Sequence, residues 1–402
     1  MVGKAGDAAA NRVKLSHRQT RPTLRLALLF IVAAALSAPV STGSWLPLHL
    51  LLAGGAVLAI SGVSLMLTVT WSAAPAPPDR AVLVQRSCVA VGAAGVAVGR
   101  STSLPSVVVA ASGILYSLGL ALLAVLLVTT FLRGSERRFA AAVVAYVCAM
   151  AAGITAVTLG VTMAVHAPTS DLRAVHATLN LLGLVGLTIS GTLPYFAATV
   201  GRARMASRAT KRSLGAVLAW QVAALAVAVA GLVAGAGPVV SGGFAAYALG
   251  VVVVVTLLPR PTRRQLKWAG PRLVGLWAGS VWWAAAVAAF AVAAAGGNYL
   301  AGSWLLVLVV AGYAQIIWGS LAYLLPVLRG GGHVRLGEGF ATTRSWVGLA
   351  AANVAGVALA VQARYVAFAA VAVWVLDSLW RAVAVGTRRS PRPSEETGAG
   401  ED

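Results

Sequence analysis

Histidines are the side chains best suited to chemistry in this sequence, and only five occur in 402 residues. His49 and His176 each lie in a long apolar run, where an ionisable group is costly and is usually retained for function. A neutral imidazole is a common ligand of iron and copper. The two residues therefore predict a metal-binding site. The alternative at each position is an interfacial histidine, or one hydrogen-bonded across helices.

Three further side chains lie close to this pair along the sequence. His166 precedes His176 by ten residues, across a short loop, and predicts either a third metal ligand or a simple loop histidine. Asn180 follows His176 by four residues, so both lie on one helical face. Its amide either orients the imidazole or bonds to a neighbouring helix. Arg173 offers a cation to a heme propionate or an anionic substrate, or else it faces lipid headgroups.

The composition excludes a water-soluble globule. Hydrophobic residues make up 59% of the chain and charged residues only 10%, against about 25% in soluble domains. The net charge of +21 is typical of nucleic-acid binding, but the Lys and Arg residues lie in short segments between apolar runs. We therefore expect a lipid bilayer, and no nucleic acid, around this protein. Cys88 and Cys148 lie in apolar runs and favour neither a disulfide framework nor a thiolate metal site.

Apolar runs long enough to cross a bilayer, which takes roughly 20 residues, dominate the chain. They predict an all-α polytopic membrane protein with a basic segment at 1–23, a membrane domain at 24–385 and a disordered tail at 386–402. The basic residues before the first run are also typical of a signal peptide. An uncleaved helix is favoured because the next run follows closely. The twelve expected spans are 24–41, 45–71, 81–99, 104–132, 139–165, 172–200, 213–236, 239–258, 270–295, 299–328, 345–362 and 364–385.

The positive charges predict the orientation of these spans. With the N-terminus inside, all but three of the 31 Lys and Arg residues fall in cytoplasmic segments. Only Arg100, Arg173 and Arg364 fall outside. We therefore expect a multi-pass protein of the cytoplasmic membrane with both termini in the cytoplasm.

An internal repeat is indicated by glycines in the second, sixth and tenth runs. Gly62, Gly191 and Gly319 lie 129 and 128 residues apart, and Ile-Ser precedes the first two. Tyr195 and Tyr323 each follow their glycine by four residues. Short matches between apolar helices also arise by chance, but here the period, the span count and the loop charges agree. The pattern predicts a pseudo-threefold arrangement of three four-helix repeats at 24–138, 139–264 and 270–385.

The motifs around the two histidines carry a resemblance to a known family. His176–Gly183 has the sequence His-Ala-Thr-Leu-Asn-Leu-Leu-Gly, which resembles the His-x-x-Leu-Asn-Leu-Leu-Gly motif of small proteins like heme-copper oxidase subunit I. Trp45–Leu50, with Val69–Pro78, is similar to membrane regions that accompany bacterial multicopper oxidases and copper nitrite reductases. Twelve helices in three arcs also resemble the scaffold of subunit I and of nitric-oxide-response heme-copper membrane proteins.

In that family, the second, sixth and tenth helices carry ligands to heme iron or copper near the outer face. The resemblance therefore implies that His49 and His176 bind heme or copper, for electron transfer or metal handling. It also implies a partner, namely a periplasmic or membrane copper oxidase or nitrite reductase.

The tenth and seventh spans depart from the family pattern. The tenth span carries Tyr313 and Gln315 but no histidine, and the seventh carries Trp220 and Gln221 in place of paired histidines. These departures argue against oxygen reduction at the usual binuclear centre. One alternative function is therefore a non-catalytic membrane scaffold or assembly factor that has lost its metal centres.

The other alternative is a small-solute transporter. Asp377 is the one acid well inside an expected span, and Arg381 follows one helical turn later, where it can neutralise the carboxylate. Carriers usually show several embedded ionisable groups and helices broken in corresponding halves. Pro194 and Pro326 interrupt the sixth and tenth spans only near their inner ends.

Overall fold

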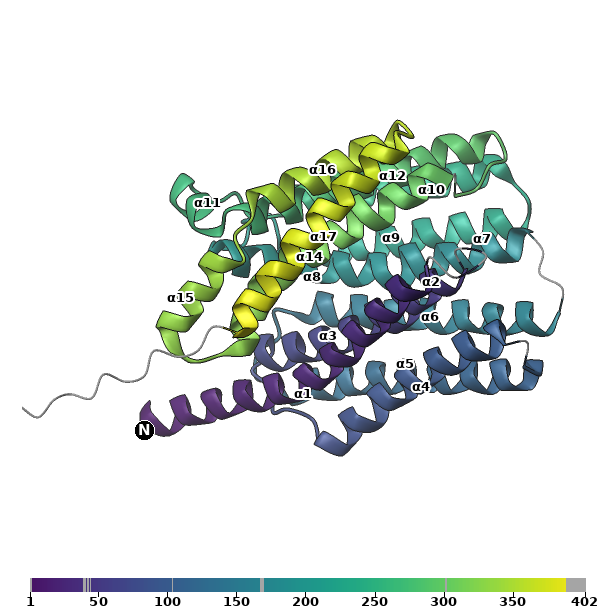
Figure 1. Ribbon diagram of the computed structural model, residues 1–402. Helices are drawn as coiled ribbons and strands as arrows, with labels where there is room; N and C mark the ends of the chain where they lie inside the picture. Colours follow the sequence, from purple (N-terminus) through teal and green to yellow (C-terminus); the bar gives the residue numbers. More distant parts are fainter. Residues whose placement is uncertain are drawn as a thin grey trace, which may run out of the picture. The chain divides into compact units, whose positions relative to one another are not determined.

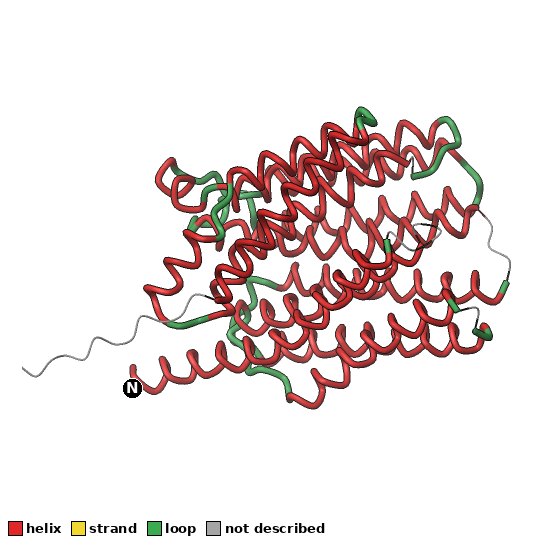
Figure 2. The backbone as a smooth tube through the Cα atoms, in the orientation of Figure 1, coloured by secondary structure: helices red, strands yellow, loops and turns green. Residues whose placement is uncertain are grey.

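The computed structural model describes residues 2–38, 41, 43, 45–102, 104–166, 170–300 and 302–387. Every regular element in these ranges is a helix, and none of them forms a strand (Figures 1 and 2). Within a lipid phase, a helix satisfies each backbone N–H and C=O inside its own segment. Long runs of Ala, Leu and Val therefore become helices, and the all-α prediction is confirmed.

The chain forms two compact units. Unit 1 comprises Met1–Phe196, Arg204–Pro259 and Val287–Ala301, and unit 2 comprises Ala197–Ala203, Arg260–Ala286 and Gly302–Asp402. The elements that begin in unit 1 are α1 (Val2–Ser37), α2 (Trp45–His49), η1 (Leu50–Ala56), α3 (Val57–Trp71), α4 (Asp79–Ser101), α5 (Ser106–Arg133), α6 (Ala140–Val165), α7 (Ser170–Thr178), η2 (Leu179–Gly186), α8 (Leu187–Gly201), α9 (Lys211–Val233) and α10 (Gly237–Thr256). Here η denotes a π-helical segment.

The elements that begin in unit 2 are α11 (Arg263–Ala269), α12 (Pro271–Ala295), α13 (Gly302–Leu306), η3 (Val307–Ala314), α14 (Gln315–Arg329), α15 (Gly332–Thr342), α16 (Trp346–Ala360) and α17 (Arg364–Thr387). Helices α8 and α12 each contribute residues to both units. The short helices α11 and α15 lie in segments that the sequence analysis left as loops.

Eleven helices in the described ranges are long and apolar enough to cross a membrane. The architecture is that of an integral, multi-pass membrane protein. The twelfth expected span, 345–362, is helical only over the 15 residues Trp346–Ala360. At 1.5 Å per residue this helix is about 22 Å long, short of the roughly 30 Å hydrocarbon core. The count of twelve is therefore not confirmed, and the pseudo-threefold arrangement stays a prediction.

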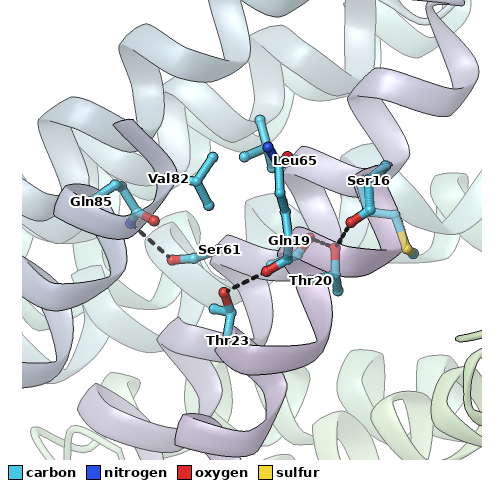
Figure 3. A pocket seen from close by; sticks show the side chains of 10 residues that line it. Ser16, Gln19, Thr20, Thr23, Ser61, Leu65, Val82 and Gln85 are labelled. Carbon is cyan, nitrogen blue, oxygen red and sulfur yellow. Dashed lines mark hydrogen bonds between the residues drawn. The ribbon is translucent and has the colours of Figure 1, made fainter. Parts of the chain in front are cut away.

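Helix α1 begins at Val2, far upstream of the expected start at residue 24. The reason is a polar stripe, Ser16, Gln19, Thr20 and Thr23, which recurs at helical spacing and is buried. Thr20 Oγ1 donates to the Gly62 carbonyl of α3. Figure 3 shows this stripe facing the α3 and α4 side chains around a small cavity. The basic segment is therefore the packed first half of α1. Residues 388–402 of the expected tail lie outside the described ranges.

Small residues let the helices of unit 1 approach closely around η2. A Cβ added at Gly183 would lie 2.5 Å from Ala152 Cβ, and one at Gly191 would lie 2.4 Å from Ala145 Cβ. No real side chain fits at such distances, so both glycines are required for α6 to pack along this helix. This contact fixes α6 beside the segment that follows His176.

Candidate metal site

Three π-helical segments interrupt the α-helices at related places. Segments η1, η2 and η3 begin at Leu50, Leu179 and Val307, so their first residues are 129 and 128 residues apart. This is the same period as that of the three aligned glycines. π-Helical turns are rare and frequently mark functional sites. The backbone thus repeats a device that the sequence period alone did not reveal.

His49 and His176 lie beside the first two of these segments and come together in unit 1. His49 is the last residue of α2, directly before η1, and His176 lies in α7, three residues before η2. Their ring centroids are 6.2 Å apart, and the ring planes are inclined by only 18°. Both side chains are half-buried. Two histidines separated by 127 positions in the sequence therefore form one site, in which α2 and α7 meet (Figure 1).

The hydrogen bonds of the two rings define which nitrogen is available. His49 Nδ1 lies 2.7 Å from the Trp45 carbonyl oxygen, and His176 Nδ1 lies 2.8 Å from that of Ala156. A carbonyl oxygen only accepts, so each Nδ1 carries the hydrogen. In a neutral imidazole the lone pair is then on Nε2. Each ring is thus oriented as metal-binding histidines commonly are, with Nδ1–H on a backbone carbonyl.

Neighbouring residues hold both rings in place. The indole of Trp45 stacks on the His49 ring with centroids 4.2 Å apart. On the other side of the site, α6 approaches His176 through Gly160, where an added Cβ would lie 3.1 Å from His176 Cε1. The small residue at Gly160 lets the Ala156 carbonyl one turn earlier reach His176 Nδ1.

Asn180 contacts the same imidazole. Its Nδ2 lies 3.3 Å from His176 Nε2 and 2.9 Å from the His176 carbonyl oxygen. Of the two roles expected from the sequence, the contact with the ring is the one observed. Because an amide N–H donates, His176 Nε2 accepts, which agrees with the tautomer deduced from Nδ1.

The other expected site residues lie at the margin of the pair. His166 is exposed at the end of α6, and residues 167–169, between it and α7, lie outside the described ranges. Arg173 is exposed on α7, three residues before His176. Across the described ranges, His, Cys, Asp and Glu side chains form no group of three or more that could hold a metal ion. The donor set that the structure brings together is therefore the histidine pair.

The segment η3 in unit 2 has no histidine beside it. Gln315 follows η3, is fully buried, and has no hydrogen-bond partner for either amide atom within the described structure. Tyr313 packs edge-on against Trp283, with ring centroids 5.6 Å apart. The absence of a histidine in the tenth span therefore coincides with a different, densely packed environment.

Two tyrosines that the sequence analysis did not single out bond to the π segments. Tyr116 of α5 donates its hydroxyl to the Ala53 carbonyl of η1 at 2.9 Å, and Tyr247 of α10 donates to the Leu182 carbonyl of η2 at 2.6 Å. Ala53 and Leu182 are 129 residues apart, and the two tyrosines are 131 apart. In unit 2 the corresponding contact is apolar: Trp374 of α17 packs in a cluster with Val310 of η3. The recurrence of tyrosine at the repeat period was the available sequence signal.

Two small cavities lie at matching places below η1 and η2. The first, about 10 Å³, includes Ser61 and Gln85, whose side chains are hydrogen-bonded at 3.3 Å (Figure 3). The second, about 20 Å³, includes Ser190 and Gln221. Ser61 and Ser190 directly precede the aligned glycines. Ser190 Oγ and both amide atoms of Gln221 lack hydrogen-bond partners in the described structure, and a cavity of this size holds one water molecule.

Asp377 and Arg381 form the ion pair that their spacing predicts. Arg381 Nε donates to both carboxylate oxygens, at 2.9 and 3.0 Å, and its Nη1 donates to the Thr342 and Arg344 carbonyls. The embedded acid is thus neutralised within unit 2, so it is not a free proton-binding group of the kind that carriers use.

Neither a protein-family model nor a curated protein matches this chain. The chain is therefore characterised by its own structure, as an all-helical protein of the multi-pass membrane type with a histidine pair between two π-helical segments.

Proposed function

We propose that His49 and His176 bind one copper ion or one heme iron within an oxidase-subunit-I-like membrane scaffold, near the outer face of the membrane. The bound metal serves electron transfer or metal handling, together with a copper oxidase or nitrite reductase as partner. The observation that carries the proposal is the approach of the two rings to 6.2 Å with both Nδ1 atoms engaged by carbonyls.

The donor set fits such a metal. A metal–nitrogen bond of about 2.0–2.1 Å puts two imidazoles that oppose each other across one ion roughly 6 Å apart, centroid to centroid. The observed separation is 6.2 Å. Imidazole suits copper and iron, and two imidazoles are a familiar donor set for heme iron. Both Nε2 atoms would be the ligands.

A copper or heme iron centre supplies one-electron chemistry when bound, and the chain's own residues do the rest. The Trp45 and Ala156 carbonyls fix the two tautomers and ring orientations. The Trp45 indole covers one face of the His49 ring and keeps water from it. Tyr116 and Tyr247 hold η1 and η2, and therefore the register of the helix beside each histidine.

The experiment is a metal analysis and visible spectrum of the full chain, purified in a mild detergent and titrated anaerobically with Cu(I) against a chromogenic chelator. We expect one copper, or one heme with a Soret band, per chain. His49→Ala and His176→Ala should each lower metal affinity at least about 100-fold, since one imidazole cannot replace two. His333→Ala, at an exposed position of α15, is the matched control and should leave affinity unchanged.

Two outcomes would contradict the proposal. A colourless wild type that takes up neither copper nor heme would favour a scaffold or assembly factor without metal centres. Solute flux into liposomes that depends on Asp377, and not on the histidines, would favour a transporter. If His166→Ala lowers affinity as strongly as His176→Ala, the donor set includes a third imidazole.

A further inference from the structure

Three arginines converge on one aromatic ring at one end of unit 2. Arg202 follows α8, Arg272 lies in the first turn of α12, and Arg344 precedes α16. The guanidinium carbons of Arg202 and Arg272 lie 3.9 and 5.1 Å from the centroid of the Trp268 six-membered or five-membered ring system. Arg344 Nη2 donates to the Lys267 carbonyl at 2.7 Å, one residue away from Trp268.

Arg272 is the buried member of this arginine cluster. It is 1% exposed, and its Nε and Nη2 donate to the Ala269 and Trp268 carbonyls at the end of α11. Its guanidinium also lies 4.6 Å from the centroid of Phe340. The remaining nitrogen, Nη1, is buried without a hydrogen-bond partner in the described structure. A buried charged donor left unpaired is costly unless an acceptor reaches it.

Arg202 is held in an unfavourable backbone conformation. Its φ is +48°, a region that residues with a side chain seldom adopt. The conformation is stabilised by Gln265 Nε2, which donates to the Arg202 carbonyl at 2.8 Å, and by the stacking on Trp268. The chain thus tolerates local strain while placing an exposed guanidinium beside the buried one.

Capping of α11 explains only part of the cluster. The carbonyls of Lys267, Trp268 and Ala269 account for the donors of Arg344 and two donors of Arg272. They leave Arg272 Nη1 and the Arg202 guanidinium without an acceptor role. The charges of Arg202 and Arg344 also act on Arg272.

No carboxylate neutralises this cluster within the described ranges. The ion pairs there join Arg18 to Asp79 and Arg381 to Asp377. Asp377, which belongs to unit 2, is thus engaged by Arg381. Three neighbouring cations without an anion repel one another, and a bound anion would offset that repulsion.

The geometry points to a binding site for a phosphate group formed by Arg202, Arg272 and Arg344. Guanidinium groups bind phosphate oxygens through paired, charge-assisted hydrogen bonds. The site lies at the ends of apolar helices, where the headgroups of a bilayer would begin, and basic pockets there bind anionic lipids. The phosphate is supplied either by an anionic phospholipid or by a soluble phosphate.

The test measures the thermal-unfolding midpoint of the delipidated full chain in neutral detergent. Phosphatidylglycerol, phosphatidylcholine and inorganic phosphate are added separately. Phosphatidylglycerol at saturation should raise the midpoint of the wild type by about 3–6 °C, and phosphatidylcholine by much less. An equal rise with inorganic phosphate would support the site with a soluble anion as its source.

The variants separate this site from general surface charge. Arg272→Gln removes a buried structural contact and is expected to impair folding, so the informative variant is the double change Arg202→Gln with Arg344→Gln. It should lose most of the rise. The control is Arg263→Gln with Arg264→Gln, two exposed charges on α11 outside the cluster, which should keep it. Equal stabilisation by both lipids, or equal responses of the two double variants, would overturn the inference.

Discussion

The π segments of unit 1 and the π segment of unit 2 share a backbone and differ in the side chains around it. Beside η1 and η2 lie His49 and His176, and tyrosine hydroxyls bond to both segments. Beside η3 there is no histidine, and Trp374 packs where the tyrosines lie in unit 1. The comparison teaches that the repeated backbone is a structural device, on which two positions carry polar chemistry and the third is closed by apolar packing.

The residue before each aligned glycine shows the same division. Ser61 and Ser190 leave small polar cavities in unit 1. Trp318 stands at this position in unit 2, where its ring lies against Gly275 and Gly348. The bulky indole fills the space that Gln85 and Gln221 line in unit 1. Polar residues are thus retained in the two repeats that contribute the histidines.

The largest expected effect comes from giving the third repeat the serine of the first two. Trp318→Ser removes a half-buried indole from between two glycines and leaves a void that α14 cannot close. We expect a loss of about 2–3 kcal/mol in the free energy of unfolding, measured by denaturation in mixed micelles. The control Trp346→Ser, at a residue 55% exposed, should cost far less. Equal costs would show that Trp318 does not fill a cavity.

A smaller effect is expected from removing the hydroxyls that bond to η1 and η2. Tyr116→Phe and Tyr247→Phe each leave a π-segment carbonyl without its donor, which should cost about 1–2 kcal/mol. Because each segment adjoins a histidine, Cu(I) affinity should fall several-fold as well. The measurements are unfolding and chelator competition on the same samples.

Trp374→Phe supplies the matched change in unit 2. It reduces packing against Val310 and should lower stability while leaving Cu(I) affinity unaltered. If it weakens metal binding as much as Tyr116→Phe does, the proposed division between the repeats is wrong.

The smallest effect is expected at Asn180. Its amide donates to His176 Nε2, the nitrogen assigned to the metal, over a long 3.3 Å. Asn180→Ala removes this competing donor and should raise Cu(I) affinity by roughly two- to fivefold, in keeping with a weak hydrogen bond. A fall in affinity would instead identify Asn180 as a residue that orients the ring.

Much of the fold follows from hydropathy, and the departures have identifiable causes. The apolar runs predicted the helices within a few residues from 45–71 to 299–328. The start of α1 was missed because Ser16, Gln19 and Thr20 are polar residues that pack inside the protein. The twelfth span was overestimated because the helix ends at Ala360, and Gln362 then adopts φ +60°.

The candidate site was partly predictable. His49 and His176 were found from the cost of placing an imidazole in an apolar run, but their 6.2 Å approach depends on how the second and sixth helices pack. Tyr116 and Tyr247 were missed because a tyrosine in a span resembles an interfacial anchor until its hydroxyl is seen on a carbonyl.

The sequence by itself determined the helical class, the membrane-type architecture and the period of the glycines, because these depend on local composition and spacing. The tertiary structure decided which side chains meet. It placed two imidazoles together, assigned their hydrogens through backbone carbonyls, and gathered three arginines around Trp268. Such contacts join residues far apart in the chain, and only the packing of helices against one another sets the distances between them.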